Sequence, residues 1–338
     1  MGMASHLQLQ GLGELQLQGW ADEALATAQI EGETLQINSV RASAARRLGL
    51  DGAKPEPRDA RTEATLDLLQ AALQHSTKPL TDDTLWAWQA ALFPTGRSGL
   101  QRITTGAYRT HAEPMQIVTP RLGKSDIVHY QAPASADVPA HMQVLIDWFN
   151  TSLGRIDGLV RAALAHLWLE AIHPFEDGNG RVGRALVELA LAQDLKNDQR
   201  LWSLSQQMWL DRHGYYAQLQ AATGQANMNV TPWVQWFVGC VEKAANATWH
   251  HMQIAVQKTR FWAELRERFP QLTSTQTKAI NKLYDAGPDD FACGMSTEKY
   301  VNLCGVSRAT AYRELTALCE MGVLVQMGVG RGTRYHFK

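Results

Sequence analysis

Apolar residues recur with a helical repeat along most of the chain. Residues 159–172 and 182–195 are mostly apolar, which predicts two buried helices. Pro174 should end the first of them, because proline disfavours helical geometry in the residue before it. Thr81 is placed to cap a further helix that continues to Leu92. The pattern therefore predicts a mainly α-helical protein.

Two short strand-like runs interrupt the helical pattern. Residues 115–118 and 126–130 contain isoleucine and valine, and residues 119–125 between them contain proline and glycine. Apolar runs on either side of such a connection are typical of paired antiparallel strands. The arrangement predicts a small β-hairpin.

The last part of the chain, from about residue 270, has the pattern of three short helices followed by two strands. Ser296 and Ser307 are each placed to cap a helix, and Gly305 favours a tight turn between them. Two strand-like runs, residues 323–325 and 333–337, follow. This order predicts a winged helix. Its recognition helix would carry Ser307, Arg308, Thr310, Tyr312 and Arg313.

Composition narrows the classes of function. The chain has 338 residues, 45% of them hydrophobic, which is enough for a full core in two or three domains. Its net charge of −1 argues against a general nucleic-acid or membrane-surface partner. The four cysteines have no C-x-x-C spacing, so neither a zinc site nor a disulfide framework is predicted. No signal peptide or membrane span is visible, and we expect a cytoplasmic protein with no membrane partner.

The densest chemistry lies in residues 173–184, HPFEDGNGRVGR. His173 is a proton acceptor, Asp177 a metal-binding carboxylate, and Arg181 and Arg184 are two guanidinium groups. The Gly-Asn-Gly step is expected in the loop that leads into a helix N-terminus, where free N–H groups and the helix dipole favour a polyphosphate. Each residue alone has an ordinary structural explanation, but their combination indicates phosphoryl-type or nucleotidyl transfer.

The run resembles the signature of the Fic family, H-x-F-x-[D/E]-G-N-G-R-x-x-R, at every specified position. Fic proteins are mostly helical enzymes, and most of them transfer AMP from ATP to a hydroxyl group of a target protein. The resemblance implies that His173 is the general base, and its ordinary pKa of about 6.5 suits that task. It also implies that Phe175 anchors the loop and that Asp177 holds Mg²⁺ on the ATP phosphates. The implied phosphate-binding residues are Gly178, Asn179, Gly180, Arg181 and Arg184.

Residues 27–32, TAQIEG, resemble the inhibitory motif of the same family, [S/T]-x-x-x-E-[G/N]. The resemblance implies that Glu31 forms a bidentate pair with Arg184 and so occupies the arginine that the γ-phosphate needs. The alternative is that Glu31 is an ordinary exposed glutamate. The position of the motif upstream of a complete Fic signature favours the inhibitory role.

The family resemblance extends to the hairpin and to residues after the signature. In Fic proteins such a hairpin is a flap that pairs with an extended segment of the target. The resemblance implies that flap residues Ile127, Val128, His129 and Tyr130 lie over the nucleotide. Tyr216, in a Y-Y-x-x-L stretch, would border the adenine pocket, and Thr223 aligns with a nucleotide-contacting position.

The expected organisation is an N-terminal helical segment with the inhibitory motif (residues 1–69), a helical Fic core with the hairpin flap (70–255), and a linker helix with a winged helix-turn-helix domain (256–338). From Asp290 onward the chain has six Lys and Arg against four Asp and Glu. DNA-binding domains are usually more basic, so DNA binding and protein contacts, including homodimer formation, are both compatible with this domain.

Two classes of function fit the sequence. The first is a protein adenylyltransferase that uses ATP and Mg²⁺, modifies an unknown target protein, and is inhibited by Glu31. The second is a transcription regulator whose Fic core senses a nucleotide. The intact His173, Asp177 and Arg184 favour an enzyme, because a sensor has no need of a base. Within the enzyme class, removal of AMP and use of another nucleotide are the alternatives.

Overall fold

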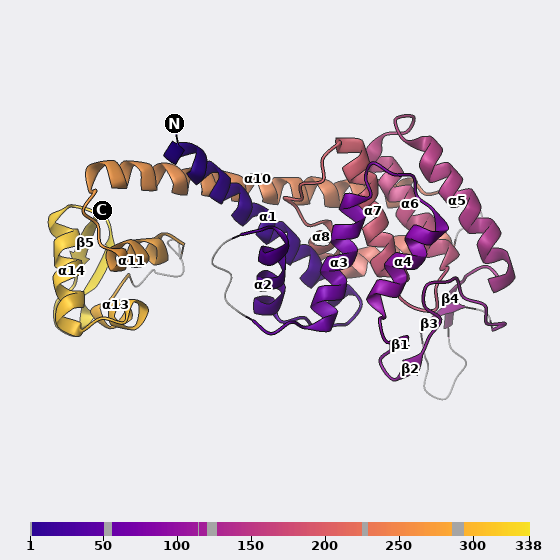
Figure 1. The fold of residues 1–338 in the computed structure, drawn as a ribbon, viewed down its shortest axis with the longest axis horizontal. Helices are drawn as coiled ribbons and strands as arrows, with labels where there is room; N and C mark the ends of the chain where they lie inside the picture. The colour runs from indigo at the N-terminus through magenta and orange to yellow at the C-terminus, as the bar shows by residue number, and fades with distance from the viewer. Residues whose placement is uncertain (1, 51–55, 114, 120–126, 225–228, 286–293) are drawn as a thin grey trace. The chain divides into compact units, whose positions relative to one another are not determined.

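The computed structural model describes residues 2–50, 56–113, 115–119, 127–224, 229–285 and 294–338. The chain forms two compact units, Met1–Met252 and Gln253–Lys338. Helices dominate both, as Figure 1 shows. The fold class predicted from the sequence, a mainly helical Fic fold with small hairpins, is confirmed. The domain boundaries predicted at residues 69 and 255 stay predictions.

Ten helices and two hairpins are described in the first unit, the last helix continuing into the second unit. The helices are α1 (Gly2–Ile30), α2 (Ile37–Arg47), α3 (Ala60–Gln74), α4 (Asp82–Leu92), α5 (Val138–Ser152), α6 (Gly158–Ile172), α7 (Asn179–Leu195), α8 (Leu204–Leu210), α9 (Arg212–Thr223) and α10 (Thr231–Arg268). The strands are β1 (Arg97–Ser98), β2 (Gln101–Arg102), β3 (Gln116–Thr119) and β4 (Ile127–Gln131), and a 3-10 turn, η1 (Ser135–Asp137), precedes α5.

The centre of the first unit is the pair α6 and α7, the two helices that the apolar runs predicted. Asp157 caps α6 by accepting from the backbone N–H groups of Leu159 and Val160. The two helices can pack closely at Gly183 because glycine has no side chain. A Cβ at this position would lie 2.9 Å from Glu170 Oε1. Full burial of a large apolar side chain contributes roughly 1.5–3 kcal/mol. The fully buried residues of this core include Phe149, Leu169, Phe175, Val182, Leu186, Leu189, Trp233 and Phe237.

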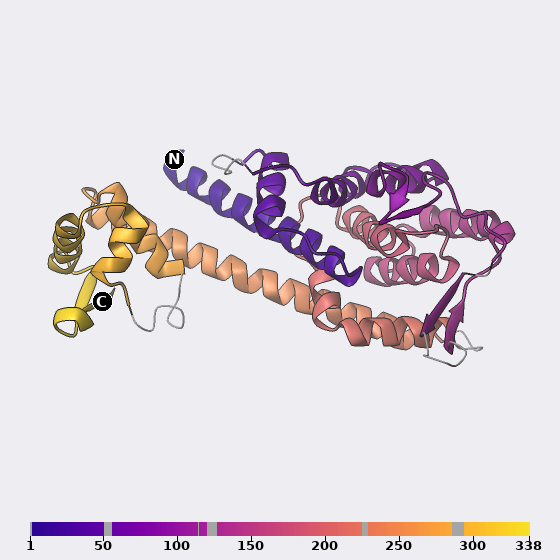
Figure 2. The ribbon, with the colours of Figure 1, turned by 90° about the horizontal axis from the view of Figure 1, so that it is seen from below.

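Helices α1, α2 and α3 form an N-terminal layer that contacts α7 and α8. Figure 2 shows α1 as one uninterrupted helix. Its buried face carries small residues, Ala21, Ala24 and Ala28, which let the neighbouring helices approach closely. Trp20 and Val40 complete this second core cluster. The layer therefore places the end of α1 against the α6–α7 core.

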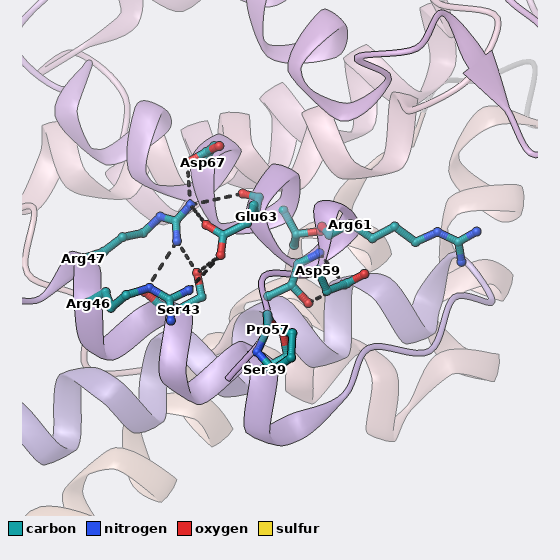
Figure 3. Close-up of polar contacts among 11 residues, drawn as sticks. Ser39, Ser43, Arg46, Arg47, Pro57, Asp59, Arg61, Glu63 and Asp67 are labelled. Atoms are coloured by element: carbon teal, nitrogen blue, oxygen red, sulfur yellow. Dashed lines mark hydrogen bonds and ion pairs between the residues drawn. The ribbon is translucent and has the colours of Figure 1, made fainter. Parts of the chain in front are cut away.

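Polar contacts connect α2 to α3 (Figure 3). Asp59 caps α3 by accepting from the backbone N–H of Thr62 at 2.9 Å. Arg47 on α2 forms ion pairs with Glu63 at 2.7 Å and with Asp67 at 2.6 Å on α3. Ion pairs near the surface contribute only about 0–1 kcal/mol each, so these contacts fix the orientation of the two helices more than they stabilise them.

The predicted hairpin is present as β3 and β4, which pair antiparallel with Gln116 opposite Gln131 and Thr119 opposite Ile127. A bulge lies between Ile117 and Val118. The predicted turn, residues 119–125, falls almost wholly outside the described residues. The smaller hairpin β1–β2 was not predicted from the sequence.

The second unit has the arrangement predicted for a winged helix. Its elements are the end of α10, α11 (Ser274–Asp285), α13 (Thr297–Cys304), α14 (Arg308–Glu320), β5 (Leu324–Met327), a 3-10 turn η2 (Gly330–Gly332) and β6 (Arg334–Phe337). Ser296 caps α13 and Ser307 caps α14, and Gly305 takes a φ of 67° at the end of α13, all as expected. Tyr300, Leu315 and Tyr335 form the middle of a separate core. Among the described residues, no helix is both long and apolar enough to cross a membrane.

Candidate active site

The residues of the sequence motif meet where α6 ends and α7 begins. Helix α6 ends at Ile172, and His173 takes a left-handed conformation with φ 51° and ψ 60°. Helix α7 begins at Asn179, after Gly178 with φ 90°. The expectation that the Gly-Asn-Gly step lies in the loop is wrong, since Asn179 and Gly180 already belong to the first turn of the helix. The first-turn N–H groups of a helix lack partners inside the helix, so they could bind an anion.

The side chain of Asn179 shapes the loop between the two helices. Its Oδ1 accepts from the backbone N–H of Phe175 at 2.9 Å, and its Nδ2 donates to the Phe175 carbonyl at 2.8 Å. Phe175 is fully buried, so the anchoring role that the resemblance implied has a direct structural counterpart. Because both polar atoms of the Asn179 side chain are used inside the protein, an anion would contact the backbone of this segment.

Burial lowers the pKa of the His173 imidazole, and the positive charge of Arg109 acts in the same direction. The carbonyl of Glu170 and the carboxylates of Glu31 and Asp177 oppose this shift without cancelling it. The imidazole is therefore neutral at pH 7 and can accept a proton, as a general base must.

Arg184 is buried to 3% exposure, and its Nε and Nη2 groups donate to Thr27 and Glu31 at the end of α1. Nη2 lies 2.6 Å from Glu31 Oε1, so the predicted contact between these residues is present. It is not the bidentate pair that was expected, because Arg184 Nε donates instead to Thr27 Oγ1 at 2.7 Å. Thr27, the first residue of the proposed inhibitory motif, thus shares the arginine with Glu31.

The geometry at the end of α1 explains how Glu31 reaches Arg184. Gly32 takes a φ of 75°, its N–H bonds to the Gln29 carbonyl at 3.0 Å, and the Glu33 N–H bonds to the Ala28 carbonyl at 2.9 Å. This is a Schellman ending, in which glycine occupies the left-handed position just after the helix. Gly180 provides the space on the other side, since a Cβ there would lie 2.4 Å from Glu31 Oε1.

Burial alone would raise the pKa of Glu31, but the charge of Arg184 and its hydrogen bond, with the charges of Arg181 and His173, lower it. Glu31 is therefore ionised at neutral pH. The carboxylate in turn raises the pKa of Arg184. The result is an ion pair in the position where the sequence resemblance places ATP phosphate groups.

Arg181 is also in contact with carboxylates. Its Nη1 lies 3.3 Å from Glu33 Oε1 and its Nη2 lies 3.7 Å from Asp177 Oδ1. The guanidinium packs over the ring of Phe93 with its Cζ 4.9 Å from the centroid. Glu33 was not singled out in the sequence, although it lies two residues after Glu31 in the same turn.

Asp177 stands beside the first turn of α7 with its side chain 34% exposed. Ser98 from β1 donates to Asp177 Oδ2, and the Gly178 N–H donates to Oδ1. Within the described ranges, no group of three or more His, Cys, Asp and Glu is arranged to hold a metal ion. A single carboxylate fits Mg²⁺ that arrives with phosphate oxygens, because that ion usually keeps few protein ligands.

Comparison with known proteins agrees with this geometry. Residues 79–191 match the family model described as Fic/DOC family. This match includes the whole signature run from His173 to Arg184. Residues 1–50 match a domain of unknown function, DUF4172, and residues 293–338 match the C-terminal domain of the transcriptional regulator DIP2311-like family. The Fic domain thus lies between two segments that match other models.

The curated relatives resemble only part of this chain. A protein adenylyltransferase Fic of Nematostella vectensis is 28% identical over 138 residues, 40% of this chain and 30% of the relative. A probable protein adenylyltransferase of Aquifex aeolicus is 36% identical over 75 residues, 21% of this chain and 23% of the relative. The chain therefore spans about a third or less of these relatives. The solved structure of a Fic family protein from Desulfovibrio desulfuricans G20 is similar to this chain, with a TM-score of 0.53 at 21% identity. The similarity extends over 100% of this chain and 96% of that structure.

The other residues predicted to contact the nucleotide, Tyr216, Thr223 and the flap residues, have different partners in the structure. The Tyr216 hydroxyl donates to the Ile30 carbonyl at the end of α1 at 3.1 Å, so it too contacts the inhibitory segment. The Thr223 hydroxyl donates to the Leu219 carbonyl within its own helix at 2.9 Å. Tyr130 on the flap donates from its hydroxyl to a carbonyl near the end of α6. The side chains of Ile127, Val128 and His129 lie outside the described part of the structure, and the nucleotide contacts stay predictions.

Sequence reasoning missed a buried polar group behind Arg184. His166 Nε2 lies 2.7 Å from the Tyr215 hydroxyl, and burial lowers the pKa of His166 to about 3. Burial, with the nearby charge of Glu31, raises the pKa of Glu170 to about 7. A helical repeat of three and four connects His166 and Glu170 to His173 on one face of α6, which is the signal that could have found them.

Proposed function

We propose that this protein is an adenylyltransferase that moves AMP from ATP to a Ser, Thr or Tyr hydroxyl of a target protein, and that Glu31 inhibits it. The observation that carries the proposal is the 2.6 Å contact between Glu31 and Arg184. It lies in one site with a neutral His173 and the N-terminus of α7. The printed names of the curated relatives, protein adenylyltransferases, support the same reaction.

In the proposed reaction His173 takes the proton of the target hydroxyl as the hydroxyl oxygen attacks the α-phosphorus. The new O–P bond forms while the bond to the bridging oxygen breaks, and pyrophosphate leaves. The backbone N–H groups at the start of α7 and the guanidinium groups of Arg181 and Arg184 hold the phosphate oxygens. Mg²⁺ held by Asp177 would neutralise part of the polyphosphate charge. Catalysis thus rests on positioning and electrostatics.

The inhibition follows from competition for one guanidinium. While Glu31 and Thr27 occupy Arg184, a γ-phosphate cannot take the same N–H groups, and its negative charge is repelled by the carboxylate. ATP is then held in a pose that does not align the α-phosphorus with His173. Truncating Glu31 removes the competitor but leaves the arginine in place.

The test is intact-mass analysis after incubation with Mg·ATP. We expect the Glu31→Gly variant to gain AMP on itself faster than the parent, by roughly two to three powers of ten, because a buried Arg–carboxylate contact is worth a few kcal/mol. The double variant Glu31→Gly, His173→Ala should be inactive again, which separates release of inhibition from general damage. An unchanged rate in Glu31→Gly with unchanged ATP affinity would contradict the inhibitory role. Activity in the double variant would contradict the base.

Two other activities are compatible with the same site. Removal of AMP would be recognised if the parent, with Glu31 in place, releases AMP from a protein that the Glu31→Gly variant has modified. A nucleotide-responsive transcription regulator is favoured by a separate observation, the match of residues 293–338 to a regulator domain. Binding of duplex DNA by the second unit would test this function.

A further inference from the structure

Residues 171–174, at the end of α6, have carbonyl groups that the flap side of the molecule satisfies one after another. The Tyr130 hydroxyl donates to the Ala171 carbonyl. Arg109 donates from Nη2 to the Ile172 carbonyl at 3.3 Å and from Nε to the His173 carbonyl at 2.8 Å. Its backbone N–H donates to the Pro174 carbonyl at 2.9 Å. The last carbonyls of a helix lack partners inside the helix. Here the partners come from two residues, Arg109 before the β3–β4 hairpin and Tyr130 on its second strand.

The remaining donors of Arg109 connect the same guanidinium to the base of the flap. Nη2 also donates to the Pro133 carbonyl at 2.6 Å, and Nη1 donates to Ser135 Oγ at 2.8 Å. Both acceptors follow β4 directly. One side chain therefore joins the chain that enters the flap, the chain that leaves it, and the residue proposed as the base.

The backbone of His173 has a conformation that needs such support. Among the described non-glycine residues, His173 and Lys196 have a positive φ. A side chain in the left-handed region is strained, and such strain persists only where the surroundings hold it. The hydrogen bonds from Arg109 to the His173 carbonyl and to the next one fix the peptide groups on that residue.

Arg109 is also an unusual buried charge. It is 1% exposed, and its partners in the part of the chain that the structure describes are carbonyl and hydroxyl oxygens, not a carboxylate. Burying a charge without a counter-ion is costly, so these neutral oxygens must compensate the guanidinium. The charge acts on the imidazole nearby, whose pKa it lowers.

We propose that Arg109 is a positioning residue of the active site. It holds His173 in its left-handed conformation, and it fixes the position of the imidazole relative to the base of the flap. The proposal rests on the proposed function, in which a target strand on the flap must present its hydroxyl to His173. A hydroxyl acceptor that is displaced by about 1 Å can lose roughly a hundredfold in rate. Flap and base must therefore move together, and Arg109 provides the connection.

Arg161 offers a matched control. It lies on α6, is also 1% exposed, and donates from Nε and Nη2 to the Phe149 carbonyl near the end of α5 at 3.3 and 2.9 Å. Replacing either arginine by methionine thus removes a buried guanidinium that binds carbonyl oxygens of a helix end. Of the two arginines, Arg109 is the one that contacts His173.

The first experiment measures AMP transfer in the Glu31→Gly background. We expect Arg109→Met to lower kcat roughly 10- to 100-fold with little change in KM for Mg·ATP. Arg109→Lys, which keeps the charge but not the planar fork, should recover part of the loss. Arg161→Met should lower the melting temperature but leave kcat within roughly twofold of its parent. Equal losses of kcat in Arg109→Met and Arg161→Met would overturn the proposal.

The second experiment needs no transfer activity. The imidazole pKa of His173 is followed by NMR titration in the same variants, its signal assigned by its disappearance in His173→Ala. The charged groups that act on this imidazole are Arg109, Glu31 and Asp177. Arg109→Met should raise the pKa, while Arg109→Lys and Arg161→Met should leave it near the parental value. An unchanged pKa in Arg109→Met would refute the coupling, and the result stays decisive even if no variant transfers AMP.

Discussion

At the scale of single residues, the site is defined by two arginines that each contact a carboxylate from the N-terminal segment. Glu31 meets Arg184 at 2.6 Å with a side chain 24% exposed, and Glu33 meets Arg181 at 3.3 Å with a side chain 28% exposed. The second contact is longer, and Arg181 divides its donors between Glu33 and Asp177, so we expect it to contribute no more than about 1 kcal/mol. Glu33 is therefore a weaker second competitor for the phosphate groups of ATP.

We expect Glu33→Gln to raise AMP transfer, but by no more than about fivefold, because about 1 kcal/mol corresponds to that factor. Intact-mass analysis with Mg·ATP measures the rate, and Glu242→Gln, an exposed change on α10, is the control. In the Glu31→Gly background the same change should add little, since the stronger competitor is gone. A rate in Glu33→Gln equal to that of Glu31→Gly would show that the two carboxylates have been ranked wrongly.

Much of the site was predictable at this scale because its chemistry lies in one short run. The signature residues from His173 to Arg184 come together where α6 ends and α7 begins, as their closeness in sequence predicted, and their roles as base, metal carboxylate and phosphate-binding arginines stay predictions. The single contact of Glu31 was not predictable, because it depends on Thr27 taking the other donor of Arg184 at 2.7 Å. Arg109 was given no role from the sequence, because its partners at the end of α6 are backbone carbonyls about sixty residues away, which carry no sequence signal.

At the scale of elements, α1 leads to the proposed inhibitory residue Glu31, and a buried carboxylate helps to attach this helix to the rest of the unit. Glu23 is 4% exposed and accepts from Arg200 at 3.0 Å and from Ser203 Oγ at 2.8 Å. Ser205 donates to the same carboxylate from its backbone and its hydroxyl. Glu23 lies on α1, eight residues before Glu31, which directly follows the end of this helix, so its contacts fix the position of Glu31 along the helix axis.

We expect Glu23→Gln to loosen α1 and to raise AMP transfer along with a lower melting temperature. Removing one partner of a buried ion pair can cost about 3–5 kcal/mol when the other charge is left uncompensated. Arg200 also forms an ion pair with the buried Glu188, so we expect a smaller loss here. Asp22→Asn, a neighbouring change off this network, is the control. If Glu23→Gln lowered the melting temperature strongly but left the rate of AMP transfer unchanged, the attachment of α1 by Glu23 would have no part in the inhibition.

The same carboxylate predicts a pH dependence. Burial alone would raise the pKa of Glu23, but Arg200, Ser205 and Ser203 together lower it below its ordinary value of 4.5. A lowered pKa in the folded state means that the stabilisation is present above about pH 4.5 and is lost as the pH falls through the folded pKa. The fall in melting temperature caused by Glu23→Gln should therefore shrink on acidification below that point.

Prediction was best for elements whose signal is local. The caps at Thr81, Ser296 and Ser307 and the flap strands were found from neighbouring residues. The start of α7 was placed wrongly, because glycines suggested a loop. Gly180 is instead required by the close approach of Glu31, which comes from a helix about 150 residues earlier. Long-range packing of this kind leaves no local pattern.

At the scale of the whole molecule, charge is divided unequally between the two compact units. The chain as a whole carries −1, yet residues 253–338 contain twelve Lys and Arg against eight Asp and Glu. In this unit α14 is the helix that the sequence predicted as the recognition helix, and Arg308, Tyr312 and Arg313 are exposed on it. The excess is modest beside that of most DNA-binding domains, but it lies on the unit that has the winged-helix arrangement. If this unit binds a polyanion, its winged-helix arrangement and its positive charge favour DNA as the partner.

We expect the full chain to bind duplex DNA measurably at low salt and to release it steeply as salt rises, since phosphate contacts displace counterions. Fluorescence anisotropy with a labelled duplex of random sequence measures both. The double change Arg308→Ala, Arg313→Ala should weaken binding and reduce the salt slope by about two, because each arginine neutralises one phosphate. Arg58→Ala, an exposed change in the first unit, is the control. Parental affinity in the double variant, or no binding at about 50 mM salt, would leave the second unit as a protein-contact domain and the Fic site as the activity of the chain.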